Sequence, residues 1–469
     1  MFYKKILSLA LLGLGLLGAC SIKNDLKPLS DDAISSKPDT SADLIVHKEV
    51  FSNGLKVIVV ENHRLPIFSY YTFFDVGSRN EPQGLFGGTH LLEHMLFKGT
   101  TKYPEGLFQQ MIEEKGGENN AYTMQDATVY YANLPSDFLA PIIDLESDRM
   151  LNLVINQESF EKERSVVLEE RRMRYENSPP SRAYQRLLEM MFEGTPYEHS
   201  VIGSNEDLKG LKQEEVYSYF KRYYAPNNAT IVIVGDVDTQ KTLSILKDKY
   251  GPIKASADLD GFKKKANDVK KFSVKTPKGD IVRLHGPNAA GQFFFAFKGE
   301  PAGSKRSYAM DILASVLGDG ESSYLMQKYV LGKKPILSSI SVSNHNFKYA
   351  GMFYIHAEAL EQTAVKVARE RLLKDFKEIC SEAVTDRSVQ KIKNQYLVGF
   401  YNGLKTNSGV ASMLGTMERL FDDYQYYKKD LAMYEAVTPQ DVRKACREIL
   451  GSDEWHFLSL WKFNRKENE

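Results

Sequence analysis

A pattern that occurs twice constrains the fold of this chain more than any other feature. The segment "QEEVYSYFKRYYAPNNATIVIVGDVD" has the apolar periodicity of a helix, a turn at Pro226 and then a buried strand at 230–234. Near the other end, "PQDVRKACREILGSDEWHFLSLWK" follows the same order without a gap when Val216 is aligned with Val442. A recurring helix–turn–strand unit predicts a duplicated domain.

Segments earlier in each half support the duplication. The β-rich stretches "FSYYTFFDVGS" and "GQFFFAFKGE" each lead to a helix that ends in glycine. We therefore predict an α+β fold of two homologous domains, at residues 44–253 and 272–469, joined by a polar linker at 254–271. Units of about 200 residues have an ordinary domain size. A chance match between the two segments is the alternative.

The N-terminus has the features of an export signal. Two lysines precede an apolar run at 6–17 that is short for a membrane span, and "LGAC" then ends at Cys20. This ending resembles the bacterial lipobox, so residues 1–20 are predicted to be a lipoprotein signal peptide with lipid attached at Cys20. The alternative is an ordinary signal peptide with a chance cysteine.

The following residues suit a lipid-anchored protein on the periplasmic side of a bacterial envelope. Residues 21–43 are rich in Ser, Asp, Lys and Pro, which is typical of a flexible tether. Ser21 after the lipid cysteine favours the outer membrane over the inner one. Two further cysteines, Cys380 and Cys446, are 66 residues apart, and this spacing leaves both a disulfide and buried free thiols open.

The charge balance gives no support to a nucleic-acid-binding function. The chain has 61 basic and 61 acidic residues and a formal net charge of zero. No long block of one sign stands out. Nucleic acid is therefore not an expected partner.

A polar triplet interrupts an apolar helix in "GGTHLLEHMLFKGT". His90 and His94 lie one turn apart on one helical face, so both imidazoles can reach one ion, and Zn²⁺ suits such donors. Glu93 comes one residue earlier than His94 and can take a proton from water as a general base. When Gly99 is aligned with Gly318, the second half has only apolar residues at these positions: Ala309, Ile312 and Leu313. The alternative is two partly buried histidines and a solvated glutamate.

The helix-forming segment "ESFEKERSVVLEERRMRYE" offers a third ligand. Glu163 and Glu170 fall on one stripe with Val166 and Val167, which predicts that both carboxylates face the core. Glu169 lies about 100° away around the helix and is expected to be solvated. We predict Glu170 as the metal ligand and Glu163 as the carboxylate that orients a histidine. Salt bridges to Arg171 or Arg174 are the alternative role of the two carboxylates.

The triplet resembles the H-x-x-E-H signature of the pitrilysin, or insulinase-like, zinc metallopeptidases, also called inverzincins. The resemblance implies a third ligand in an E-R-x-V-V-like helix, and "ERSVVLEE" places Glu170 76 residues after His94. It also implies that Asn120 and Ala121, in "GGENNAYTMQDATVYYANLP", bind the substrate backbone by strand addition. The chain is most similar to two-domain members of mitochondrial-processing-peptidase size, whose halves close like a clamshell.

The second half departs from the family pattern. The resemblance implies an Arg and, seven residues later, a Tyr that hold the substrate and polarise the scissile carbonyl. In "KYVLGKKPILSSISV" the nearest equivalents are Leu331 and Ser338. We predict a homodimer or, with a related subunit that supplies the Arg and Tyr, a heterodimer. The competing explanation uses donors of this chain, for which the candidates are Lys333, Lys334 and His345.

Together these features predict a zinc endopeptidase with one Zn²⁺ per chain that hydrolyses peptides or unfolded protein segments in the bacterial envelope. One alternative is a non-catalytic or partner-dependent subunit, which loss of ligands would mark. The other is a purely structural lipoprotein, which explains the duplication but not the two polar clusters.

Overall fold

The computed structural model describes residues 44–286 and 291–462. The predicted signal peptide, the tether and the lipidation site Cys20 lie outside the described residues. Within the described part, none of the helices is long and apolar enough to cross a membrane.

The first half is built on a six-stranded mixed sheet with strand order β1-β2-β6-β3-β5-β4. Strands β2 and β6 are parallel and the other neighbours are antiparallel. The strands are β1 (Val46–Val50), β2 (Lys56–Glu61), β3 (Ile67–Phe74), β4 (Glu118–Thr123), β5 (Thr128–Pro135) and β6 (Ala229–Gly235). The helices are α1 (Gly88–Met95), α2 (Leu107–Glu114), α3 (Leu139–Asn152), α4 (Gln157–Arg171), α5 (Pro179–Met191), α6 (Asn205–Gly210), α7 (Gln213–Tyr223) and α8 (Thr239–Tyr250).

The second half repeats this plan with a five-stranded sheet of order β7-β11-β8-β10-β9. Strands β7 and β11 are parallel, as β2 and β6 are. The strands are β7 (Asp280–Gly286), β8 (Gln292–Lys298), β9 (Leu337–Asn346), β10 (Gly351–Ala359) and β11 (His456–Lys462). The helices are α10 (Lys305–Gly318), α11 (Tyr324–Tyr329), α12 (Ala364–Asp375), α13 (Ile379–Glu382), α14 (Asp386–Gly403), α15 (Asn407–Phe421), α16 (Tyr426–Ala436) and α17 (Pro439–Leu450).

The predicted two-domain α+β fold is confirmed. The repeated segments fold as α7 followed by β6 and as α17 followed by β11, in register with the sequence alignment. The aligned residues Val216 and Val442 are both fully buried. Helix α17 begins with a capping box between Thr438 and Asp441, which satisfies N–H groups at the first turn.

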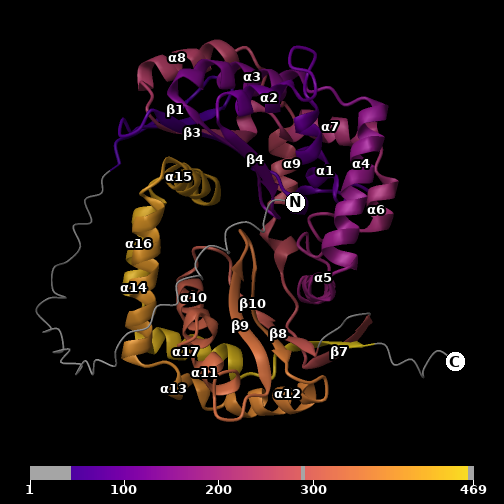
Figure 1. Cartoon of the computed structure of the whole chain (residues 1–469), viewed down its shortest axis with the longest axis vertical. Coiled ribbons are helices and arrows are strands. Elements are labelled where there is room, and N and C mark those ends of the chain that lie inside the picture. The colour runs from indigo at the N-terminus through magenta and orange to yellow at the C-terminus, as the bar shows by residue number, and fades with distance from the viewer. Residues whose placement is uncertain (1–43, 287–290, 463–469) are drawn as a thin grey trace, which may run out of the picture. The chain divides into compact units, whose positions relative to one another are not determined.

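One helix of each half packs against the sheet of the other half. Helix α5, from the first half, packs against β8 and β11, whereas α15, from the second half, packs against β3 and β6. Figure 1 shows the gold α15 beside the purple strands of the first sheet. The paired strands are equivalent in the two sheets, so the exchange is reciprocal.

The segment expected to be a polar linker contains a short helix, α9 (Leu259–Ala266). Leu259 is almost completely buried in the core of the first half. The predicted domain boundaries themselves remain predictions.

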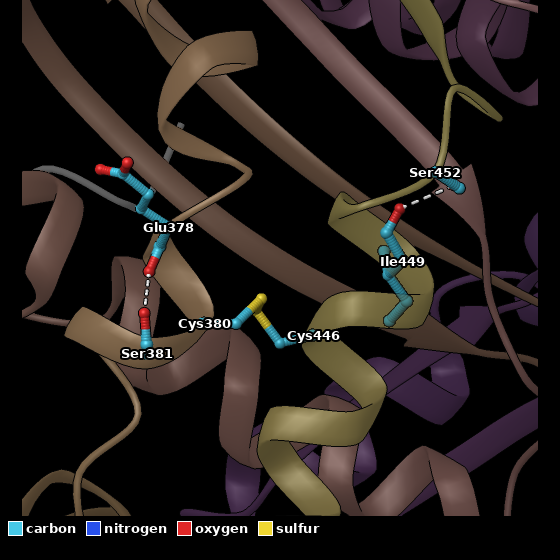
Figure 2. Close-up of a disulfide and its surroundings, with 6 residues drawn as sticks. All are labelled: Glu378, Cys380, Ser381, Cys446, Ile449 and Ser452. Atoms are coloured by element: carbon cyan, nitrogen blue, oxygen red, sulfur yellow. Dashed lines mark hydrogen bonds between the residues drawn. A yellow bond between two sulfur atoms is a disulfide. The ribbon is translucent and has the colours of Figure 1, made fainter.

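The two buried cysteines of the second half form a disulfide that joins α13 to α17. Figure 2 shows the Cys380–Cys446 bond between these helices. The structure thus resolves the alternative that the sequence spacing leaves open, because only the fold brings helices 66 residues apart in sequence into contact.

Candidate metal centre

Helix α1 is held in place at its first turn by a buried carboxylate. Glu81 accepts hydrogen bonds from the N–H groups of Gly87 at 2.9 Å and Thr89 at 2.7 Å. Gly87 has a φ of 84°, and a Cβ atom there would lie 2.5 Å from the carbonyl oxygen of Ile202. A glycine is therefore required where the chain turns into the helix.

The two faces of α1 have different roles. Leu91, Leu92 and Met95 are fully buried and fix the helix in the core. The histidines of the triplet and Glu93 are half-buried. The triplet is thus carried on a helix whose rotation the apolar side chains prevent.

Helix α4 presents the two predicted carboxylates. Glu163 and Val167 are buried, and the Glu170 side chain is only 16% exposed. Val166, expected on the same core-facing stripe, is instead 46% exposed, because the buried face is centred closer to Phe160, Glu163 and Val167. The sequence pattern placed this valine wrongly. Glu169 is 63% exposed and pairs with Arg172, the residue that follows the end of α4.

The structure brings His90, His94 and Glu170 together. One ligand atom from each lies within 4.8 Å of the others. The Nε2 of His94 is 3.3 Å from Oε2 of Glu170, and the Nε2 of His90 is 3.9 Å from its Oε1. The same Oε1 is 2.7 Å from Nη1 of Arg174.

Glu163 contacts the far side of one histidine. Its Oε1 is 3.0 Å from Nδ1 of His94, and its Oε2 is 2.6 Å from Nζ of Lys98. A carboxylate on Nδ1 leaves Nε2 free to face an ion. Lys98 is absent from the sequence predictions, although its spacing of one helical turn from His94 could have indicated it.

The two imidazoles have opposite electrostatic environments. Burial and the neighbouring His94 lower the pKa of His90 to about 4, which keeps it neutral. Burial also opposes the charged form of His94, but the hydrogen bonds to Glu163 and Glu170 outweigh it and raise its pKa to about 9. In the protein without metal, one proton on His94 thus balances the carboxylates around it.

Glu93 is held beside the triplet by a strand residue. Thr123, the last residue of β4, donates a hydrogen bond of 2.5 Å from Oγ1 to Oε2 of Glu93. Burial raises the pKa of Glu93, and the Thr123 bond partly opposes this. The sequence gives no signal for Thr123, because its contact depends on how the strand lies over α1.

The donor set fits a catalytic zinc ion. Two imidazoles and one carboxylate are a known ligand set for such sites, which keep a fourth position open. The Nδ1 atom of His90 is buried and makes no hydrogen bond with any described residue. The role of the three side chains as ligands remains a prediction.

The predicted substrate-binding residues lie on an open edge. Strand β4 is the last strand of its sheet, and Asn120 and Ala121 pair with β5 on one side only. The N–H of Ala121 donates to the Asn120 side chain at 2.8 Å rather than to a neighbouring strand. An extended peptide could therefore pair with this edge.

The second half has no Arg and Tyr at the expected positions. Leu331 follows α11 and is 51% exposed, and Ser338 lies near the start of β9 with its hydroxyl bonded to the carbonyl oxygen of Glu358. Of the alternative donors, Lys333 and Lys334 are exposed. His345 is half-buried, and its Nδ1 is hydrogen-bonded to the Tyr184 hydroxyl at 2.8 Å.

The chain is similar to known peptidases over most of its length. A family model described as Insulinase (Peptidase family M16) matches residues 56–205, and one described as Peptidase M16 inactive domain matches residues 210–396. The zinc protease PqqE of Helicobacter pylori is 29% identical over 389 residues, 81% of this chain and 83% of the relative. A probable mitochondrial-processing peptidase subunit beta of Arabidopsis thaliana is 24% identical over 394 residues, 82% of this chain and 71% of the relative.

Solved structures show the same fold. A protease from Helicobacter pylori matches with a TM-score of 0.79 and 25% identity, over 89% of this chain and all of the other. A structure from Pseudomonas fluorescens, titled peptidase M16 inactive domain, matches with a TM-score of 0.78 and 19% identity, over 90% and 98% of the two chains. With both family models matched in order along a duplicated fold, the chain belongs to the insulinase-like peptidase family M16.

Proposed function

We propose that this protein is a zinc-dependent endopeptidase that hydrolyses peptides or unfolded protein segments. The observation that carries the proposal is the convergence of His90, His94 and Glu170 within 4.8 Å, with Glu93 fixed beside them. A non-catalytic subunit would not need a half-buried carboxylate next to an intact ligand set.

The residues of the chain have distinct parts in this chemistry. Zinc, when bound by His90, His94 and Glu170, supplies a Lewis acid that makes water more acidic and polarises the scissile carbonyl. Glu93 accepts the proton of the attacking water and then passes it to the leaving amine. Glu163 holds the ring of His94 in the orientation that ligation needs.

The substrate would bind as an additional strand. The open edge of β4 offers backbone groups to an extended peptide, and Asn120 and Ala121 lie in its middle. A folded protein has few free extended segments, so unfolded chains and short peptides are the expected substrates.

Three glutamine variants test the proposal. Glu93→Gln should abolish hydrolysis of an unstructured peptide and keep about one zinc per chain, because it removes the base and no ligand. Glu170→Gln should lose zinc, whereas Glu169→Gln should keep both zinc and activity. Metal analysis and peptide turnover are measured on all three variants, and wild-type turnover by Glu93→Gln would overturn the mechanism.

We also propose a lipid-anchored location on the periplasmic side, with the outer membrane favoured. The disulfide between Cys380 and Cys446 supports an oxidising compartment. Cys20→Ser should leave the protein unprocessed and without lipid, since that residue supplies both the cleavage signal and the attachment atom. Unchanged partitioning of the variant into detergent would overturn the location.

A partner subunit is proposed for the missing Arg and Tyr. Loss of one donor to the reacting carbonyl typically costs about 10²- to 10³-fold in rate, and two are absent here. A related chain with the Arg and Tyr but without H-x-x-E-H would supply them in a heterodimer. The test assays the zinc-loaded chain alone and with that companion; full activity alone, with no gain on mixing, would show that no partner is needed.

A further inference from the structure

A cavity of about 630 Å³ lies beside the candidate metal centre. Its walls come from both halves of the chain: the turn that follows α4, helix α5, and the sheet strands β8, β9 and β10. Eleven residues line it, and none of them is an aspartate or a glutamate. The cavity is large enough for a substrate side chain together with its neighbouring backbone.

One wall of this cavity touches the metal centre directly. Arg174 lines the cavity, and its Nη1 is 2.7 Å from Oε1 of Glu170. Arg174 belongs to a π-helical turn, η5 (Arg172–Glu176), that continues α4, and such turns are frequent at functional sites. A group bound in the cavity would therefore lie close to the bond that the metal centre acts on.

The remaining walls are largely aromatic. His356 of β10 stacks on Phe294 of β8, with ring centroids 4.4 Å apart. Tyr184 of α5 faces Tyr354 at 5.8 Å between centroids. These rings offer an apolar surface to the aliphatic part of a bound side chain.

The polar groups of the cavity are mostly hydrogen-bond donors. The Arg174 guanidinium has five N–H donors, and only the bond to Glu170 involves a described partner. The Nε2 of His356 is buried and makes no hydrogen bond with any described residue. The lining also contains the hydroxyls of three tyrosines and three serines. An ammonium group would find no anionic partner here, whereas a carboxylate would meet a cation and several donors.

We propose that this cavity is a substrate subsite that takes a carboxylate of the peptide, either an acidic side chain or the free C-terminus. The inference rests on the proposed peptidase function and adds which substrates the peptidase prefers. Arg174 is the residue that determines specificity, and the aromatic rings hold the aliphatic part of the bound residue.

Matched peptides test the subsite. Unstructured peptides carry Glu, Gln or Lys at one position at a time, each with a free or an amidated C-terminus, and kcat/KM is measured for each. The wild-type chain should prefer Glu over Lys at one position by about tenfold, the value expected for a charge-assisted hydrogen bond. If only amidation lowers kcat/KM, the bound carboxylate is the chain end.

Two arginine variants test whether Arg174 causes the preference for the Glu peptide over the Lys peptide. In Arg174→Gln the ratio of kcat/KM for the Glu and Lys peptides should fall to about one. Arg172→Gln is the matched control, since Arg172 pairs with the exposed Glu169 and does not line the cavity. A ratio within one variant does not depend on how much zinc that variant holds, which matters because Arg174 contacts Glu170.

Binding to the Glu93→Gln variant separates this inference from the proposed function. Dissociation constants for the Glu and Lys peptides are measured on Glu93→Gln with and without the Arg174→Gln change. A preference of about tenfold for the Glu peptide that disappears with Arg174→Gln supports the subsite even where no peptide is cleaved. Equal binding and equal cleavage of the Glu and Lys peptides by the chain with Arg174 intact, together with no loss on amidation of the C-terminus, would overturn the subsite.

Discussion

Thr123 shows how one residue outside the sequence motif can control the motif. Among the described residues, its hydroxyl is the only hydrogen-bond donor to the Glu93 carboxylate, at 2.5 Å. A general base must point at the water it deprotonates, so a single hydrogen bond that fixes its rotamer affects the rate.

Thr123→Val should therefore lower kcat about tenfold, the loss expected for one hydrogen bond of about 1.4 kcal/mol, while zinc content and KM stay close to wild type. Thr123→Ser keeps the hydroxyl and should restore most of the rate. Steady-state kinetics with metal analysis measure this. Equal kcat for the valine and serine variants would show that the hydroxyl does not position Glu93.

Asp311 is the residue through which we expect the stability of the second half to depend on pH. It lies on α10 and accepts hydrogen bonds from Asn344 at 2.9 Å and Tyr434 at 2.8 Å. Burial raises its pKa to about 6, above the ordinary value of about 3.9. The protonated form is favoured in the folded state, so its stabilising contribution is complete below pH 4 and is lost as the pH rises through 6.

Asp311→Asn should remove this dependence. The Tm of the wild-type chain should fall further between pH 4.5 and pH 7.5 than the Tm of the variant. The reason is that a shift of about two pKa units corresponds to about 2–3 kcal/mol in the free energy of unfolding. Asp319→Asn, on an exposed residue after the same helix, is the control and should behave like wild type. Parallel pH profiles for all three proteins would contradict the prediction.

At the scale of elements, α15 depends on a close approach to the sheet of the other half. A Cβ atom on Gly415 would lie 2.0 Å from the ring of Phe73, which is itself buried in β3. Neither group can move without opening the contact between helix and sheet.

Gly415→Ala should destabilise the protein by about 1–3 kcal/mol through overpacking. Gly399→Ala is the same change inside α14, where a Cβ meets nothing within 4 Å, and it should stabilise by about 0.5–1 kcal/mol. Urea unfolding of both variants measures the difference. A stabilising Gly415→Ala would mean that α15 does not pack on β3 in solution.

At the scale of the whole molecule, each half of the chain depends on contacts with the other. Besides the exchange of α5 and α15, the turn between β9 and β10 reaches into the first half. There the N–H of Lys348 donates to Asp126 at 3.0 Å, and Asp126 also accepts from Arg79 at 2.6 Å and Tyr197 at 2.8 Å. Separation would expose an apolar face of each sheet and leave buried charges without partners.

The fragment 44–276 should therefore not fold stably when it is produced alone, although it holds every predicted ligand. Co-expression with the fragment 277–469 should give a soluble complex that binds zinc, because each fragment supplies the helix that covers the other's sheet. Solubility, circular dichroism and metal content measure this. A monomeric, cooperatively folded fragment 44–276 would contradict the prediction.

The sequence by itself determined the duplicated α+β plan and predicted the triplet as a metal site. Both follow from local periodicity, which sets the faces of α7 and α17 and places His90 and His94 one turn apart. The same periodicity separated Glu170 from the exposed Glu169, although it misplaced Val166, because a helical stripe read from four residues has an uncertain centre.

Only the tertiary structure decided which distant groups meet. The choice of His94 as the histidine that Glu163 contacts, the bond from Thr123 to Glu93 and the disulfide all depend on how segments distant in sequence pack together. The exchange of α5 and α15 is likewise decided by the tertiary structure. An apolar helix face in the sequence does not indicate which of the two sheets it covers. Which sheet it covers depends on the close fit of particular side chains, such as Gly415 against Phe73, and that fit exists only once the chain is folded.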